Sequence, residues 1–277
     1  MSTTPLPAVY GQSDRPPRGD YVRQGNVAAD YSCPQNYAAY TAQDHDTYKR
    51  LYQRQTALLP GLACDAFIEA LPLMGESDEI PRFDQVNEKL HKATGWLIVA
   101  VPGLIPEFAF FCLLANQKFP VTDWIRTPAE FAYVVEPDVF HDLFGHVPLL
   151  FNPIFAKHLQ AYGAGGIKAH RLGACELLSR LYWHTIEFGL IRQPNGLRAY
   201  GAGILSSSGE LGHAIASTLT KRVDLNLLRA MQTSYKIDQY QSIYFVIDSF
   251  QQLYDITTPD FTLLYEQLKV LKGPESE

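Results

Sequence analysis

Residues 136–150, EPDVFHDLFGHVPLL, place two histidines, His141 and His146, five positions apart in an apolar run bounded by prolines. On a regular α-helix, five steps of about 100° would set the two imidazoles about 140° apart, so they could not reach a common point. Either a π-turn widens the helix here, or the helix breaks near Gly145, where glycine permits the distortion. Such irregularities are frequent at functional sites. The alternative interpretation is a pair of hydrogen-bonded core histidines.

A second stretch supplies a carboxylate in an apolar setting. Residues 168–192, KAHRLGACELLSRLYWHTIEFGLIR, form the longest apolar segment, and we expect a helix there that is buried on most sides around Glu187. An ion pair of Glu187 with Arg180 or His184 is one interpretation. A metal ion shared with the two histidines is the other. Two imidazoles and one carboxylate form the set that suits non-haem Fe(II) with open positions for oxygen.

The composition favours a small-molecule partner. The chain has 277 residues, a net charge of −6 and 47% hydrophobic residues, which is ample for a buried core. Acidic and basic residues are interleaved, so we expect no nucleic-acid or membrane partner. The N-terminus lacks a signal sequence and no run is long enough to span a membrane, which predicts a cytoplasmic protein. The four cysteines are widely spaced and are expected to be reduced.

The pattern along the chain predicts one domain, mainly α with a few short β strands (α+β). Residues 1–35 are a polar arm expected to be disordered, residues 36–272 the catalytic domain, and residues 273–277 a disordered tail. Helical patterns cover residues 42–59, 64–71, 81–95, 107–117, 152–162, 224–232 and 261–271. WLIVAVPG and IYFVI are the strand candidates, and RAYGAGILSSSGEL is predicted to be a loop region.

Four stretches together resemble one family. They are VPGLIPEFAFF, EPDVFHDLFGHVPLL, RLYWHTIEFGL and YGAGILSSSGE. Their order and spacing are similar to those of the tetrahydropterin-dependent aromatic amino acid hydroxylases, over residues 37–271. The chain most resembles the short bacterial members that hydroxylate phenylalanine. The resemblance implies the catalytic domain fold of that family, with Fe(2+) held by His141, His146 and Glu187. It also implies tetrahydrobiopterin or a related tetrahydropterin, with O2 and L-phenylalanine as substrates and L-tyrosine as product.

The same resemblance implies roles for further residues. Pterin contacts fall on Gly103, Leu104, Ile105, Phe110, Asp142 and Tyr182, and substrate contacts on Arg126, Pro137, Trp183, Phe188 and Ser206. Phe110 would stack on the pterin, although its apolar helix also fits a core residue. Arg126 and Ser206 would hold the substrate carboxylate, whereas a solvated arginine is the alternative. His184 and Val134 depart from the family pattern.

Other functions remain as alternatives. A di-iron carboxylate protein would use two Glu-x-x-His pairs, Glu88 with His91 and Glu210 with His213, but their surroundings read as solvated or locally capped. A non-catalytic amino-acid-binding module would be expected to lack one of the three metal ligands. Within the family, the near alternatives are hydroxylation of tyrosine or of tryptophan. The apolar side chains Trp183 and Ile237 favour phenylalanine over both. The short N-terminal arm and the absence of an added heptad helix predict a monomer.

Overall fold

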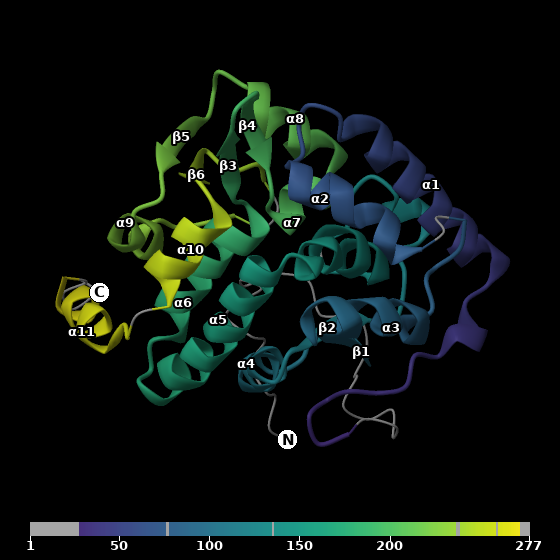
Figure 1. Ribbon diagram of the computed structural model, residues 1–277, viewed down its shortest axis with the longest axis horizontal. Helices are drawn as coiled ribbons and strands as arrows, with labels where there is room; N and C mark the ends of the chain where they lie inside the picture. The colour runs from purple at the N-terminus through teal and green to yellow at the C-terminus, as the bar shows by residue number, and fades with distance from the viewer. Residues whose placement is uncertain (1–27, 76–77, 135, 237–238, 259, 272–277) are drawn as a thin grey trace.

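The computed structural model describes residues 28–75, 78–134, 136–236, 239–258 and 260–271, and within them helices dominate over a few short strands, as predicted (Figure 1). The α-helices are α1 (Ala42–Leu58), α2 (Asp65–Ala70), α3 (Phe83–Thr94), α4 (Glu107–Ala115), α5 (Pro153–Arg171), α6 (Cys175–Tyr182), α7 (Ala202–Ser206), α8 (Ser208–Ala216), α9 (Leu227–Gln232), α10 (Phe250–Thr257) and α11 (Thr262–Leu271). The predicted strands are found as β1 (Leu97–Val101) and β6 (Ile243–Ile247).

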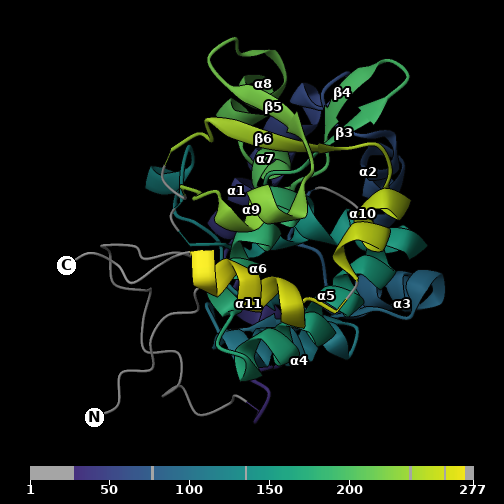
Figure 2. The same cartoon turned by 90° about the vertical axis from the view of Figure 1, so that its left-hand side faces the viewer.

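Two small sheets flank the central helices. The first pairs β1 with β2 (Lys118–Thr122) in parallel, joined through α4. The second has the order β4-β3-β6-β5, where β3 is Leu190–Gln193, β4 is Gly196–Ala199 and β5 is Lys221–Asp224. Figures 1 and 2 show the four-stranded sheet at one end of the molecule, above α5 and α6. The segment that carries Glu187 leads directly from α6 into β3, so this sheet fixes its C-terminal end.

Local signals explain where several helices begin and end. Thr41 and Asp44 form a capping box at the start of α1, and the Asn152 side chain accepts backbone hydrogen bonds at the start of α5. α3 ends at Gly95, whose φ of 80° is the left-handed conformation that glycine adopts without strain. These boundaries agree with the helices predicted from the sequence.

Close packing holds α4 against α5, two helices that lie side by side in Figure 1. A β-carbon at Gly163 would lie 2.4 Å from the backbone nitrogen of Ala115, and one at Gly166 would lie 2.1 Å from the Phe111 ring. Only hydrogen fits at either position, so the two helix backbones approach closely. This contact positions Phe110 and its neighbours in the core.

The structure differs from the sequence predictions in several places, and β3, β4, β5 and α10 were not predicted at all. The expected long helix around Glu187 is α6 followed by a π-helix, Trp183–Glu187, and then by β3. The predicted loop region is wrong: it contains α7 and the first turn of α8, which Ser207 caps by accepting a hydrogen bond from the Glu210 N–H. β2 was missed because it contains Pro120, which is tolerated in this two-stranded edge.

The last residues of the predicted arm contact the domain. Cys33 forms a bridge with Ala100, and the Gln35 amide donates to the Pro81 carbonyl. Residues 1–27 and 272–277 lie outside the described part of the chain, as does Ile237. Among the helices described, none is long and apolar enough to cross a membrane.

Candidate active site

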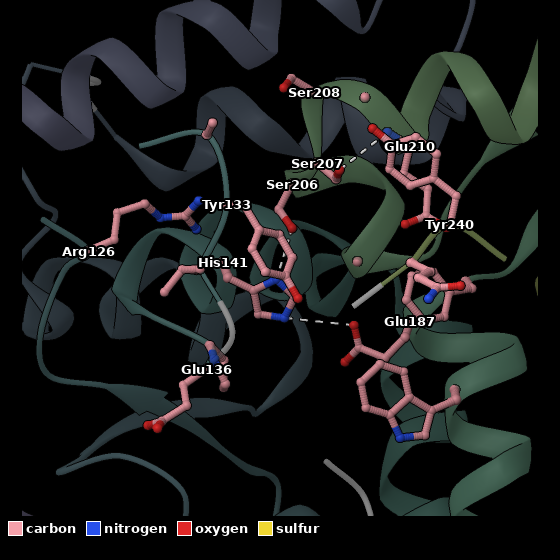
Figure 3. Close-up of a pocket in the computed structure, with 18 residues that line it drawn as sticks. Arg126, Tyr133, Glu136, His141, Glu187, Ser206, Ser207, Ser208, Glu210 and Tyr240 are labelled. Carbon is pink, nitrogen blue, oxygen red and sulfur yellow. Dashed lines mark hydrogen bonds and ion pairs between the residues drawn. The ribbon is translucent and has the colours of Figure 1, made fainter. Parts of the chain in front are cut away.

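A cavity of about 730 Å³ brings half of the predicted site residues together (Figure 3). His141 and Glu187 line it, together with the five predicted substrate residues Arg126, Pro137, Trp183, Phe188 and Ser206. The volume is in the range of small-molecule sites. Residues from widely separated parts of the sequence therefore meet at one hollow.

The two histidines of the opening motif lie on a π-helix, His141–His146. Its i→i+5 pattern returns the chain to the same side after five residues, which a regular α-helix would not do. The two Nε2 atoms are 3.1 Å apart. The π-turn that the spacing predicted as one of two options is present, and it directs both imidazoles to one point.

Glu187 completes this group from a second π-helix. Its Oε1 lies 3.1 Å from His146 Nε2, and its Oε2 lies 3.7 Å from His141 Nε2. The alternative partners are engaged elsewhere: Arg180 pairs with Glu176, and His184 Nε2 bonds the Thr233 carbonyl. The structural ion pair considered for Glu187 is therefore not formed. Figure 3 shows its carboxylate facing the His141 ring.

Electrostatics in this group favour a neutral His141 and an ionised glutamate. Burial lowers the pKa of His141 to about 4, despite the opposing effect of Glu187. Burial alone would raise the pKa of Glu187, but interactions with His146 and His141 outweigh it and the pKa is lowered. Two imidazole nitrogens and one carboxylate thus converge in a buried place where a cation could bind all three.

Ser206 fixes the orientation of His141. Its hydroxyl lies 2.8 Å from His141 Nδ1 and donates its hydrogen to the Ala202 carbonyl, also at 2.8 Å. Since the hydroxyl has one hydrogen, it accepts from a protonated Nδ1, which leaves the Nε2 lone pair facing Glu187. Ser206 borders the cavity, but its hydrogen bonds to His141 and to the Ala202 carbonyl orient the His141 ring.

A second carboxylate, Asp142, also lies near the histidines. One of its oxygens is within 4.8 Å of a nitrogen of each of His141 and His146. However, its Oδ2 accepts a hydrogen bond from the Thr122 N–H at 2.8 Å, and burial raises its pKa to about 7. Glu187 lies 3.1 and 3.7 Å from the two histidines and has the lowered pKa, so it is the better anionic donor.

Arg126 is buried and paired with Asp138. Its Nε and Nη2 donate to the two oxygens of Asp138 at 2.7 and 2.9 Å, while Asp138 also accepts from the His141 N–H at 2.9 Å. No described residue accepts a hydrogen bond from Nη1. The solvated-arginine alternative is wrong, because only 5% of Arg126 is exposed. Asp138 ties this cation to the start of the histidine helix.

Aromatic rings form another wall of the cavity. Trp183 stacks on Phe188 with ring centroids 5.5 Å apart and on Tyr235 with centroids 4.7 Å apart. Pro137 and Val134 add apolar surface. Trp183 is held in place from two sides, which makes it a rigid part of the wall.

The residues predicted to contact pterin lie apart from the cavity lining. Phe110 is buried and meets Tyr182 edge to face at 5.7 Å, and Tyr182 in turn stacks on His146 at 6.5 Å. Gly103, Leu104 and Ile105 precede α4, which carries Phe110. Tyr182 therefore connects the pterin candidates with the histidine group.

Sequence reasoning missed several residues of the site. Asp138 follows Pro137 and precedes an apolar run, a helix-start pattern that could have identified it. Tyr133, Tyr240 and Glu210 also line the cavity. Glu210 was expected to be solvated or locally capped. The cap is present, because Ser207 accepts from the Glu210 N–H, but the side chain is not solvated: its Oε1 accepts from the Tyr244 hydroxyl at 2.7 Å, and burial raises its pKa to about 7. No local pattern indicated Tyr133 or Tyr240, and the Glu-x-x-His pattern of Glu210 pointed to a different function.

The di-iron alternative finds no support in the described residues. Glu88 and His91 are exposed on α3, and neither Glu-x-x-His pair belongs to a cluster of three or more metal-binding side chains there. By contrast, His141, His146 and Glu187 lie close together, and each offers a donor atom suited to a metal ion.

Comparisons with known proteins give a consistent result. The model of the family described as biopterin-dependent aromatic amino acid hydroxylase matches residues 11–263. The chain is 57% identical over 242 residues to phenylalanine-4-hydroxylase of Chromobacterium violaceum, covering 87% of this chain and 82% of that protein. It is 47% identical over 259 residues to phenylalanine-4-hydroxylase of Caulobacter vibrioides, covering 93% and 86% respectively. A crystal structure of the Chromobacterium violaceum enzyme bound to cobalt superposes with a TM-score of 0.88 at 56% identity, over 90% of each chain.

Proposed function

Because the chain belongs to the biopterin-dependent aromatic amino acid hydroxylases, we propose that it is a phenylalanine 4-monooxygenase. It converts L-phenylalanine to L-tyrosine with O2, Fe(II) and a tetrahydropterin. The observation that carries the proposal is the convergence of two imidazoles and one carboxylate at a cavity that also holds a buried arginine.

The donor set fits a metal ion such as Fe(II). Ligand atoms about 2.1 Å from one cation, at right angles to each other, lie about 3 Å apart. The separations of 3.1 Å between the two Nε2 atoms and 3.1 Å between His146 and Glu187 agree with this expectation, and the 3.7 Å between His141 and Glu187 is longer by several tenths of an ångström. We infer that His141, His146 and Glu187 hold the iron, and that Asp142 stays outside the ligand set.

When bound, iron and the reduced pterin supply the electrons that activate O2. The protein's own side chains then have to bind and orient the substrate. A carboxylate that enters a largely apolar cavity needs a compensating cation, and Arg126 lines the cavity with Nη1 not bonded to any described residue. Asp138 holds the other side of the guanidinium, so Arg126 is oriented before the substrate arrives.

The aromatic wall would hold the substrate ring. Trp183, Phe188 and Pro137 give a flat apolar surface beside Glu187, so a phenylalanine side chain can lie against them with water excluded. Position then decides which ring carbon reacts, and no side chain has to act as an obligatory acid or base. Ser206 contributes by holding the His141 ring rather than by contacting the substrate.

The pterin site is proposed at Gly103, Leu104, Ile105, Phe110 and Tyr182, with Asp142 at its border with the metal. Its support is the ring series from Phe110 through Tyr182 to His146. Phe110 is 1% exposed, so a pterin can stack on it only after the groups that cover its ring move.

Phenylalanine is favoured over tyrosine and tryptophan as the substrate. A ring hydroxyl placed against Phe188 and Pro137 would find no hydrogen-bond partner on these two side chains, and an indole would crowd Trp183, which Phe188 and Tyr235 fix in place. We further propose a monomeric cytoplasmic enzyme, for which sedimentation analysis tests the oligomeric state.

Product analysis tests the function. Purified protein reconstituted with Fe(II) and a tetrahydropterin should form tyrosine from phenylalanine, with a higher kcat/KM than for tyrosine or tryptophan in competition. Preferred turnover of tryptophan, or no hydroxylation of any aromatic amino acid, would contradict the proposal.

A further inference from the structure

Three metal-binding side chains meet outside the proposed active site. Glu107 is the first residue of α4, His170 lies in the last turn of α5, and Cys175 is the first residue of α6. One donor atom of each lies within 4.8 Å of the donor atoms of the other two. None of them takes part in the proposed hydroxylation, so the cluster needs its own explanation.

The distance between the donor atoms of Cys175 and His170 is close to that between two ligands of one ion. Cys175 Sγ lies 3.9 Å from His170 Nδ1. In a tetrahedral zinc site, with Zn–S near 2.3 Å and Zn–N near 2.0 Å, the two atoms would be about 3.5 Å apart. A contraction of a few tenths of an ångström would bring both to bonding distance. At 3.9 Å the direct contact is too long for a strong hydrogen bond.

Glu107 provides the second, independent observation. Its Oε2 is buried and has no hydrogen-bond partner among the described residues. An unsatisfied buried carboxylate oxygen is costly, and a cation beside it would remove that cost. The competing arrangement is a protonated Cys175 thiol that interacts with the Glu107 carboxyl group, in which the His170 ring packs on Phe108 at 4.9 Å.

Solvent can reach the cluster. His170 is exposed, while Glu107 and Cys175 are half-buried. An ion can therefore enter without unfolding, and a water molecule can take a fourth position. A thiolate, an imidazole and a carboxylate select a borderline-soft ion such as Zn²⁺ over Ca²⁺ or Mg²⁺, which prefer oxygen ligands.

We propose that Glu107, His170 and Cys175 form a second metal site, distinct from the proposed iron site, which takes Zn²⁺ with water as the fourth ligand. Binding displaces the thiol proton to solvent. The ion ties the first turns of α4 and α6 to the end of α5. Phe110 lies on α4 and Tyr182 on α6, so the site would fix the positions of both rings.

Cobalt substitution tests the site in the iron-loaded full-length protein. Co²⁺ bound to a thiolate gives a sulfur-to-cobalt charge-transfer band in the near ultraviolet, and the proposed iron site contains no sulfur. The band should saturate at one Co²⁺ per chain, disappear in Cys175→Ser and be displaced by Zn²⁺. His170→Ala should weaken Co²⁺ binding by at least about tenfold, since loss of groups that merely orient ligands already costs about 10-fold to 100-fold.

Cys112→Ser is the matched control, because Cys112 lies on α4 and belongs to no metal-binding cluster among the described residues. It should keep the band. The proposal would be overturned if the native protein showed no charge-transfer band, if Cys175→Ser kept the band, or if Cys112→Ser lost it to the same extent as Cys175→Ser. Glu107→Gln keeps the size of the side chain and leaves Cys175 in place, so it provides a second test of the site if Cys175→Ser folds poorly. Unchanged Co²⁺ affinity in both Glu107→Gln and His170→Ala would also overturn the three-ligand site.

Discussion

Replacing Arg126 separates a substrate-binding role from a structural one, but the structure shows that the simplest variant would mislead. Arg126 and Asp138 are 5% and 0% exposed, and three hydrogen bonds join them, two from the guanidinium and one from the Arg126 backbone N–H. Arg126→Ala would leave the Asp138 carboxylate buried without its cation, a loss of roughly 3 to 5 kcal/mol of stability. That is a large share of the roughly 5 to 15 kcal/mol of a typical domain.

The better perturbation replaces both charges, as Arg126→Met with Asp138→Asn. The asparagine oxygen can still accept a hydrogen bond from the His141 N–H, although the Arg126 N–H loses its acceptor on the other side. Exchange of a buried ion pair for neutral groups is often close to neutral in stability. The substrate carboxylate would nevertheless lose its cation. A desolvated charge pair is worth roughly 2 to 5 kcal/mol. We therefore expect kcat/KM for phenylalanine to fall by roughly 30-fold to 5,000-fold.

Phenethylamine, which lacks the carboxylate, isolates this interaction in a tyrosine and tyramine assay. It should be a poor substrate of the native enzyme and scarcely poorer with the double variant. Arg126→Lys should give an intermediate loss for phenylalanine, because it keeps the charge but not the planar fork. Equal losses for phenylalanine and phenethylamine, with iron content unchanged, would show that Arg126 supports the fold and does not hold the substrate.

Three further predictions concern the surroundings of the site. Phe110→Leu keeps most of the side-chain volume and should raise the pterin KM about fivefold, the equivalent of about 1 kcal/mol of stacking, with little change in the phenylalanine KM; a change in Tm alone would identify a core residue. Ser206→Ala should weaken iron binding by about 10-fold to 100-fold because His141 loses its orienting partner, whereas a change confined to the phenylalanine KM would indicate a direct substrate contact. Glu210 has a pKa raised to about 7, so its stabilising effect is complete below the unfolded value near 4.5 and is lost as the pH rises through 7. Glu210→Gln should therefore gain stability relative to the native chain between pH 4.5 and 7, by up to about 3 kcal/mol in urea unfolding, and a difference that does not vary with pH would refute the raised pKa.

The histidine geometry was predictable because a spacing of five residues conflicts with a regular helix. Only a π-turn or a break could resolve the conflict, and the structure has the π-turn. Glu187 was predictable for a related reason, since a carboxylate in an apolar segment requires a partner. The sequence could not say that its own segment is also a π-helix, because that depends on how β3 joins the sheet.

Contacts between distant segments lay beyond local patterns. Asp138 holds Arg126 twelve residues earlier in the chain, and Tyr244 on β6 donates a hydrogen bond to Glu210 on α8, 34 residues earlier. The small residues of RAYGAGILSSSGEL suggested a loop, yet two helices form there because Ser207 caps one and tertiary packing buries both. The local propensity of these residues for a loop was overridden by their packing against neighbouring segments.

The central claim is that Glu187, and not the nearby Asp142, completes the metal site with His141 and His146. Iron content after equilibrium dialysis tests it directly in the native chain and in His141→Ala, His146→Ala, Glu187→Gln and the matched control Asp142→Asn. The native chain and Asp142→Asn should retain one iron per chain, and the other three should lose it together with tyrosine formation. Full iron occupancy in Glu187→Gln, with loss in Asp142→Asn, would contradict the account.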